Sequence, residues 1–187
     1  MPADNALSHL DARRRLKEII KEKSLTRDKE YVLASGKSSN YYFNMKRTTF
    51  DPEGLSLICP IVYDMVSQER GTYIGGLAHG AIPIVSALVT FSATRNPIMG
   101  FYVREEIKDH GTQQLIEGFI EDGANVIILD DVTTLGSSVM KAVRAVRDRK
   151  CRVVKVITIV DRLEGAAETF SREGLAFSPI FTTKDFD

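Results

Sequence analysis

The strongest chemical signal in the sequence is an apolar run that ends in two acids and a hydroxyl-rich glycine turn. Residues 126–129 are Val-Ile-Ile-Leu, Asp130 and Asp131 follow, and residues 133–138 read Thr-Thr-Leu-Gly-Ser-Ser. Backbone N–H groups at the start of a helix can bind a phosphate together with hydroxyl groups, and Gly136 allows the chain to approach it closely. The carboxylates can accept hydrogen bonds from sugar hydroxyls. A ribose 5-phosphate fits this pattern, whereas an ordinary capping Asp would explain only one of the acids.

A second candidate is the charged segment 104–112, which directly follows an apolar run. Arg104, Lys108 and His110 could donate hydrogen bonds to a pyrophosphate as negative charge builds on it. A solvated surface loop is the alternative, because runs of charged residues are usually exposed.

A third candidate is the glycine-rich segment 75–83, which reads Gly-Gly-Leu-Ala-His-Gly-Ala-Ile-Pro. Its spacing fits neither the dinucleotide-binding pattern nor the P-loop. Its backbone amides could bind pyrophosphate, although His79 is equally compatible with a simple tight turn.

The elements that must position these segments alternate between strand and helix. Apolar runs of strand length occupy residues 73–77, 98–103, 126–129 and 153–160, and helical patterns at 82–93 and 138–149 lie between them. Such strands, buried on both faces and joined by helices, predict an α/β fold with a mostly parallel sheet flanked by helices. Ligands of these folds bind beyond the carboxyl ends of the strands, where the candidate segments lie.

Shorter elements complete the predicted fold. They are an amphipathic helix at 4–23, a hairpin of strands 31–33 and 41–45, a helix capped by Asp51 with Pro52 at its first position, a helix at 165–172 and a last strand near 180–182. The periodicity of the apolar residues and the turn-forming residues between them indicate these assignments.

Composition limits the function classes that remain. The chain has 187 residues, 43% of them hydrophobic, and its 25 Lys and Arg balance 25 Asp and Glu, so we expect one domain over 1–187 without a general field for nucleic acid or anionic membranes. Cys59 and Cys151 show no metal-binding spacing with the histidines. We expect a cytoplasmic protein, because a signal-peptide pattern and an apolar stretch of membrane-spanning length are both missing.

The segment 126–138 resembles the phosphoribosyl pyrophosphate signature of type I phosphoribosyltransferases, with four apolar residues, two acids, an apolar residue, Thr-Thr and then Gly. The resemblance implies that Asp130 and Asp131 hold the ribose hydroxyls and that residues 133–138 hold the 5-phosphate. The full set of implied contacts to phosphoribosyl pyrophosphate is Asp130, Asp131, Val132, Thr133, Thr134, Leu135, Gly136, Ser137, Ser138, His79, Gly80, Arg104, Lys108 and His110.

Within this class, Lys-Asp-His-Gly at 108–111 followed by Leu-Ile-Glu-Gly at 115–118 resembles the flexible catalytic loop of orotate phosphoribosyltransferases. This resemblance runs from about Tyr31 to the C-terminus. It implies transfer of the phosphoribosyl group to orotate in pyrimidine synthesis, with magnesium held mainly by the donor and no direct protein ligands. Lys108, Arg104, His110 and Asp131 would be catalytic, and the loop would reach the partner's site in a homodimer.

The family also has a small hood, here expected from about residues 25–50 and 177–187. Orotate is a flat anionic ring, and a guanidinium can bind its carboxylate in bidentate geometry. By resemblance Tyr42 and Phe43 contact the ring, Arg162 binds the carboxylate and Thr134 is its companion. Core packing is the alternative for the two aromatic residues, since aromatic strands usually pack.

Three positions depart from the family pattern, because relatives frequently carry a Lys where this chain has Ala34, Gly80 and Glu105. A phosphoribosyltransferase for another nucleobase, or a non-catalytic regulator that binds phosphoribosyl pyrophosphate, therefore stays open as an alternative. A regulator has no need of Arg104, Lys108 and His110, so the loop favours an enzyme.

Overall fold

A computed structural model describes residues 8–27, 31–32, 38–69, 72–106 and 114–187. Its central sheet has four parallel strands in the order β10 (Phe177–Thr182), β9 (Arg152–Asp161), β8 (Asn125–Thr133) and β5 (Thr72–Gly75). Parallel bridges from Ile74 to Gly100 and from Leu77 to Val103 place β6 (Phe101–Val103) next to β5. An antiparallel strand, β7 (Ile116–Gly118), pairs with β6. The predicted α/β fold with a mostly parallel sheet is confirmed.

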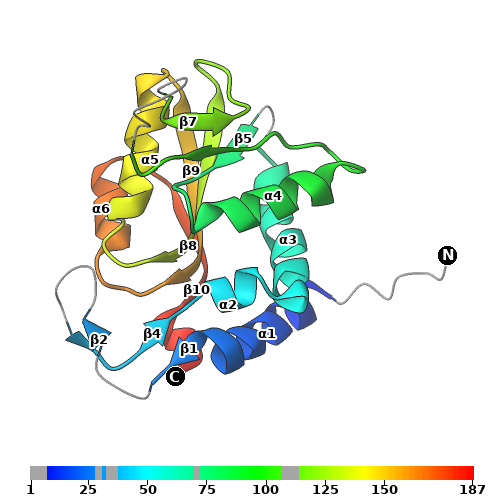
Figure 1. Cartoon of the computed structure of the whole chain (residues 1–187), viewed down its shortest axis with the longest axis vertical. Coiled ribbons are helices and arrows are strands. Elements are labelled where there is room, and N and C mark those ends of the chain that lie inside the picture. Colours follow the sequence, from blue (N-terminus) through cyan, green and yellow to red (C-terminus); the bar gives the residue numbers. More distant parts are fainter. Residues whose placement is uncertain (1–7, 28–30, 33–37, 70–71, 107–113) are drawn as a thin grey trace.

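Helices cover both faces of this sheet (Figure 1). They are α1 (His9–Ile19) with a π-helical turn at Ile20–Ser24, α2 (Lys46–Thr49), α3 (Pro52–Ser67), α4 (Ala81–Ser92), α5 (Ser137–Asp148), α6 (Ala166–Arg172) and a terminal 3-10 turn at Thr183–Phe186. The helix predicted after Asp51 forms as α3, because the Asp51 carboxylate accepts a 2.9 Å hydrogen bond from the N–H of Gly54 and Pro52 starts the helix. None of the described helices is long and apolar enough to span a membrane.

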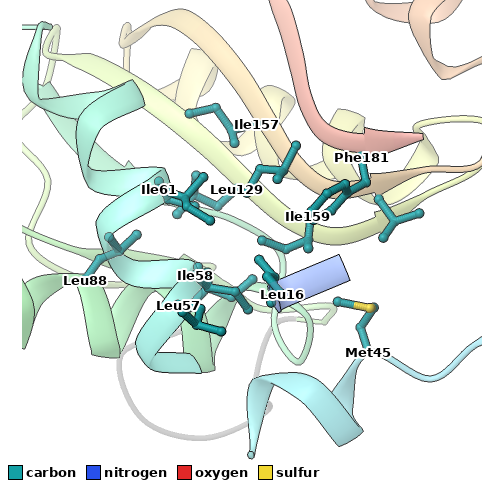
Figure 2. Packing of buried hydrophobic residues seen from close by; sticks show 14 of the residues in the cluster. Leu16, Met45, Leu57, Ile58, Ile61, Leu88, Leu129, Ile157, Ile159 and Phe181 are labelled. Carbon is teal, nitrogen blue, oxygen red and sulfur yellow. The ribbon is translucent and has the colours of Figure 1, made fainter. Parts of the chain in front are cut away.

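Strand β8 is buried on both faces because its apolar side chains alternate between two clusters. Ile127 and Leu129 pack with α1, α3 and α4, whereas Val126 and Ile128 pack with α5 and α6. The first cluster also contains Leu16, Leu57, Ile58, Ile61, Leu88, Ile157 and Ile159 (Figure 2). This packing fixes the end of β8, and with it the two acids.

The strand order places the site. In chain order the parallel strands are β5, β6, β8, β9 and β10, but their spatial order is β6, β5, β8, β9, β10. The chain therefore winds outward in opposite directions from β5 and β8. Ligands of doubly wound sheets bind at this switch point, beyond the carboxyl ends of the two strands.

The predicted N-terminal hairpin was wrong in its pairing. The strand β2 (Tyr31–Val32) pairs with β3 (Ser38–Ser39), and β4 (Tyr42–Phe43) pairs antiparallel with β1 (Leu25–Thr26) instead of with β2. Aromatic side chains mark a strand but do not select its partner, which depends here on the main chain after α1. Other short elements, among them α2, β7 and the terminal 3-10 turn, were not predicted because each has too few residues to show a repeated pattern.

Several predicted boundaries also moved. The strand expected at 126–129 extends through both acids to Thr133, and the strand expected at 73–77 ends at Gly75. The strand expected at 98–103 begins only at Phe101, and the last strand, expected near 180–182, already begins at Phe177. The expected start of the first helix at Asp4 lies outside the described residues, and Ser8 caps the helix within them.

Candidate active site

The two acids at the end of β8 lie directly against the turn after β5. A Cβ atom at Gly80 would be 2.7 Å from Oδ1 of Asp131 and 2.8 Å from Oδ1 of Asp130. A side chain at position 80 would therefore have to displace the ends of both carboxylates. The structure brings together the glycine-rich turn and the acid pair, which are about 50 residues apart in the sequence.

Local hydrogen bonds hold both carboxylates. Oδ1 of Asp130 accepts from the N–H of Asp131 at 3.1 Å, and Oδ1 of Asp131 accepts from the N–H of Val132 at 2.8 Å. Asp130 is only 7% exposed. A buried acid beside a half-buried one is costly for the fold, which is a reason to expect that the pair serves a ligand.

Burial is the main reason why the pKa values of both acids are raised. It raises the pKa of Asp130 well above 3.8, and the neighbouring charge of Asp131 raises it further. Burial also raises the pKa of Asp131. The positive charge of Lys46, at the start of α2, lowers the pKa of both acids and so partly offsets the effect.

These shifts determine how stability depends on pH. Each carboxyl binds a proton more readily in the folded than in the unfolded chain, where its pKa is near 3.8. The free energy of unfolding therefore falls as pH rises from the unfolded value through the higher folded-state value. Once ionised, the pair opposes folding.

The turn after the acids, residues 133–138, is the expected phosphate turn. Thr133 is buried at 2% exposure, Gly136 has φ +82° and Ser137 and Ser138 are exposed at the first turn of α5. A Cβ at Gly136 would lie 2.6 Å from the ring of Phe170, so both the backbone conformation and the packing require glycine. The first N–H groups of the helix remain for an anion, because Gly136 offers no capping side chain.

Of the predicted cationic residues, Arg104 and His79 lie within the described part of the chain. Arg104 follows β6 and pairs with Glu117 of β7, with Nη2 at 2.6 Å and Nε at 3.0 Å from the same carboxylate oxygen. His79 is exposed and has φ +43°, an uncommon conformation for a residue with a Cβ. Lys108 and His110 lie outside the described residues.

Arg162 is placed beside the phosphate turn. Its backbone N–H donates to the carbonyl of Thr133 at 3.0 Å, next to the half-buried Thr134. Its side chain is 3% exposed and lies over the ring of Tyr41, with the guanidinium carbon 4.8 Å from the ring centroid. The end of β9 thus meets the segment that precedes α2.

The two expected ring-contacting residues differ in exposure. Tyr42 is 43% exposed and stacks on Tyr31 at 5.4 Å, whereas Phe43 is 5% exposed and packs edge-on against Phe186 at 5.2 Å. Adjacent residues of a strand point to opposite faces. Core packing therefore describes the ring of Phe43 in this structure.

Four residues near the site were not identified from the sequence: Tyr41, Lys46, Glu117 and Glu164. Each acts through a contact or a charge that reaches across the fold or around a turn, so periodicity gives no signal for it. Only the Arg-x-Glu spacing at 162–164 could have drawn attention to Glu164.

Comparisons with known proteins agree with this arrangement. The family model described as the phosphoribosyl transferase domain matches residues 70–172. The chain is 42% identical over 185 residues to an orotate phosphoribosyltransferase of Bradyrhizobium sp., covering 96% of this chain and 100% of the relative. It is 38% identical over 176 residues to the one of Methanocaldococcus jannaschii, covering 94% and 97%.

A solved structure gives the same result. The Mycobacterium tuberculosis orotate phosphoribosyltransferase, solved in complex with 5-phospho-α-D-ribosyl 1-diphosphate, superposes with a TM-score of 0.77 at 32% identity and covers 94% of this chain and 98% of its own. The residues matched by the family model include both acids, the phosphate turn and Arg162. The chain therefore belongs to the phosphoribosyltransferase family and, within it, to the orotate phosphoribosyltransferases.

Proposed function

We propose that this protein transfers the phosphoribosyl group of phosphoribosyl pyrophosphate to orotate, which releases pyrophosphate and forms orotidine 5-phosphate in pyrimidine synthesis. The observation that carries the proposal is the meeting of Gly80 with Asp130 and Asp131 at the switch point of the sheet. An acid pair, a helix start and a glycine-rich turn are what a phosphorylated, hydroxyl-bearing sugar requires. The relatives named above match nearly the whole chain, and each is named for this activity.

The donor binds along the ends of β8 and β5. Asp130 and Asp131 accept hydrogen bonds from the ribose hydroxyls, and the segment 132–138 surrounds the 5-phosphate. The backbone at His79 and Gly80 faces the pyrophosphate. The short distance from Gly80 to both carboxylates supports this assignment, because ribose and pyrophosphate are adjacent in one molecule.

In the reaction the bond from C1 of the ribose to the pyrophosphate oxygen breaks and N1 of orotate bonds to C1. The ribose carries positive charge in the transition state, while the departing pyrophosphate gains negative charge. Arg104, Lys108 and His110 donate to that anion, and each such donor contributes about 2.7–4 kcal/mol in comparable sites. The position of Arg104 at the end of β6 supports its part in this.

Orotate lies between the hood and the end of β9. Arg162 binds its carboxylate, Thr134 lies beside Arg162, and of the two adjacent aromatic residues Tyr42 borders the ring. The contact of Arg162 with Tyr41 supports a hood formed by residues of about 25–50 and 177–187, within a single domain over 1–187. Phe43 is buried against Phe186 and stabilises the hood, whereas Tyr42 offers an exposed ring.

The donor's magnesium fits these residues. Among the described residues no group of three or more His, Cys, Asp or Glu side chains could hold a metal ion. Magnesium usually keeps several waters and is bound through one or two carboxylates and substrate phosphates, which suits Asp130 and Asp131 beside a donor that holds the ion itself. The ion would neutralise charge on the departing pyrophosphate.

The active form is a homodimer in which the loop after Arg104 reaches the partner's site. The edge of the sheet at β6 and β7 supports this assembly. A groove of about 280 Å³ there is lined by Ile82, Val85, Ser86, Val89, Gly100, Phe101, Tyr102, Glu117 and Gly118. Met99 and Phe119 are exposed next to it, at 45% and 65%. Apolar surface of this kind is typical of an interface. A cytoplasmic location stays a prediction.

The test is a substrate screen. Purified protein with magnesium and phosphoribosyl pyrophosphate should deplete the absorbance of orotate, and Lys108→Ala should slow this severely. Uracil, adenine, hypoxanthine and guanine are the competing bases, and turnover with one of them in place of orotate would reassign the acceptor. Asp131→Asn should weaken donor binding in calorimetry without unfolding the protein. Unchanged donor affinity would contradict the ribose assignment.

A further inference from the structure

The turn that follows β9 is tight and unusually constrained. The N–H of Leu163 donates to Oδ1 of the buried Asp161 at 2.9 Å, which closes the turn. Leu163 has φ +57° and Gly165 has φ +119°. A left-handed backbone is unfavourable for Leu because of its Cβ, and such residues persist where surrounding structure fixes them, often at ligand sites.

The consequence of this turn is that the side chains of Arg162 and Glu164 meet. Nε of Arg162 lies 2.9 Å from Oε1 of Glu164, and the two side chains are 3% and 17% exposed. Oε2 of Glu164 is buried and accepts no hydrogen bond from the described residues. Nε of Arg162 is likewise buried, and its contact with Glu164 is an ion pair and not a hydrogen bond, so the two side chains are held together by opposite charge at short range.

Two further contacts of the guanidinium involve Tyr41. The ring of Tyr41 lies 4.8 Å from its carbon, and the Tyr41 carbonyl is 3.5 Å from Nη2. A planar guanidinium has two edges that can bind a carboxylate in bidentate fashion, one at Nε and one at the two Nη atoms. With Glu164 at the Nε edge, an incoming carboxylate meets the Nη edge.

We infer that Glu164 is a positioning residue that fixes the orientation of Arg162 and thereby selects an acceptor base with a carboxylate. This inference rests on the proposed role of Arg162 in binding orotate. A buried guanidinium needs a counter-charge, and removal of one partner of a buried ion pair leaves the other charge uncompensated. Without Glu164 the long Arg162 side chain turns toward water and no longer presents its Nη edge.

Glu164 also brings a negative charge close to an anionic substrate, which by itself opposes binding. The two effects predict opposite changes in the affinity for orotate when Glu164 is replaced. If orientation dominates, Glu164→Gln weakens orotate binding, whereas if repulsion dominates it strengthens binding. The burial of the pair favours orientation, because a misdirected guanidinium loses both bonds to the substrate.

The experiment measures steady-state kinetics with orotate and phosphoribosyl pyrophosphate varied separately. Glu164→Gln and Glu164→Ala should raise KM for orotate, the latter by about tenfold or more, as expected for coupled residues in contact. KM for phosphoribosyl pyrophosphate should stay unchanged. Glu168→Gln is the matched control, because Glu168 is exposed nearby on α6 and its replacement by Gln removes the same charge. Thermal unfolding identifies any variant that fails to fold.

Arg162→Ala and the double variant Arg162→Ala/Glu164→Gln complete the cycle. In the Arg162→Ala background, Glu164→Gln should have no further effect on KM for orotate. An equal effect in both backgrounds, or an unchanged or lower KM in Glu164→Gln, would overturn the inference. If Arg162→Ala itself leaves KM for orotate unchanged, the proposed role of Arg162 fails instead, so the two failures are distinguishable.

Discussion

Substitution of Gly80 by Ala should weaken the use of phosphoribosyl pyrophosphate without unfolding the protein. Gly80 has φ −72° and ψ −45°, which Ala adopts without strain. The added methyl group, however, would lie 2.7 Å from Oδ1 of Asp131 and 2.8 Å from Oδ1 of Asp130. Since ordinary contact begins at 3.4 Å, the carboxylates must move by about 0.7 Å.

This movement is costly because the displaced oxygens are the ones that accept backbone hydrogen bonds. Oδ1 of Asp130 is bound to the N–H of Asp131, and Oδ1 of Asp131 to that of Val132. A hydrogen bond to a charged group contributes about 1.5–3 kcal/mol, and a misplacement near 1 Å can reduce rates about 100-fold. We therefore expect kcat/KM for phosphoribosyl pyrophosphate to fall about 10- to 100-fold, which is about 1.4–2.7 kcal/mol.

The assay follows orotate absorbance while phosphoribosyl pyrophosphate is varied at saturating orotate, and calorimetry gives the donor affinity. Thermal unfolding is the control, since Ala at the start of α4 should leave the midpoint within a few degrees. An unchanged kcat/KM with an unchanged midpoint would show that the acids do not bind the donor where Gly80 meets them. A large fall in the midpoint would assign the loss to the fold instead.

Three more changes test other parts of the site. Asp130→Asn removes the ionised carboxylate that opposes folding above its unfolded-state pKa, so at pH 8 the thermal midpoint should rise by about 2–4 °C, or about 1 kcal/mol in a chain of this size. The same variant should bind the donor more weakly in calorimetry, and a lower midpoint at pH 8 would contradict the assignment of its raised pKa. Arg104→Ala should lower kcat about 100-fold at saturating substrates, as for other donors to a developing anion, whereas Glu117→Gln, which keeps Arg104, should change it far less. Burial raises the pKa of the Cys59 thiol to about 11. At pH 8 only about one Cys59 thiol in a thousand is then ionised, and a thiol reagent should label Cys59 quickly only after denaturation.

The sheet and the acid pair could be predicted because their signals are local. Residues 126–129 form one uninterrupted apolar run, which predicts a buried strand, although β8 continues through both acids to Thr133. The helix after Gly136 follows from its apolar stripe. The carboxyl ends of parallel strands meet at one edge of the sheet, so the candidate segments could be expected to gather there.

The hood could not be predicted in the same way, because its contacts join distant segments. The partner of β4 is β1, two residues long, and a strand so short has no period to recognise. Tyr42 and Phe43 are adjacent and therefore point to opposite faces, but only the packing of Phe43 on Phe186 shows which face is buried. Glu164 is two residues from Arg162, and only the left-handed backbone at Leu163 brings their charges together.

A positive charge from the segment before α3 acts on the two acids of the central sheet. Gly80 supplies no cation to the acid pair, and the offsetting charge comes from Lys46, which belongs to α2 and lowers the pKa of both Asp130 and Asp131. A buried charge is stabilised only by a partner held at a fixed place, and α2 is held by the packing of Met45 in the core (Figure 2). Folding of the segment before α3 and ionisation of the acids are therefore coupled. The segment before α3 thus contributes to the electrostatics of the acid pair as well as to the surroundings of Arg162.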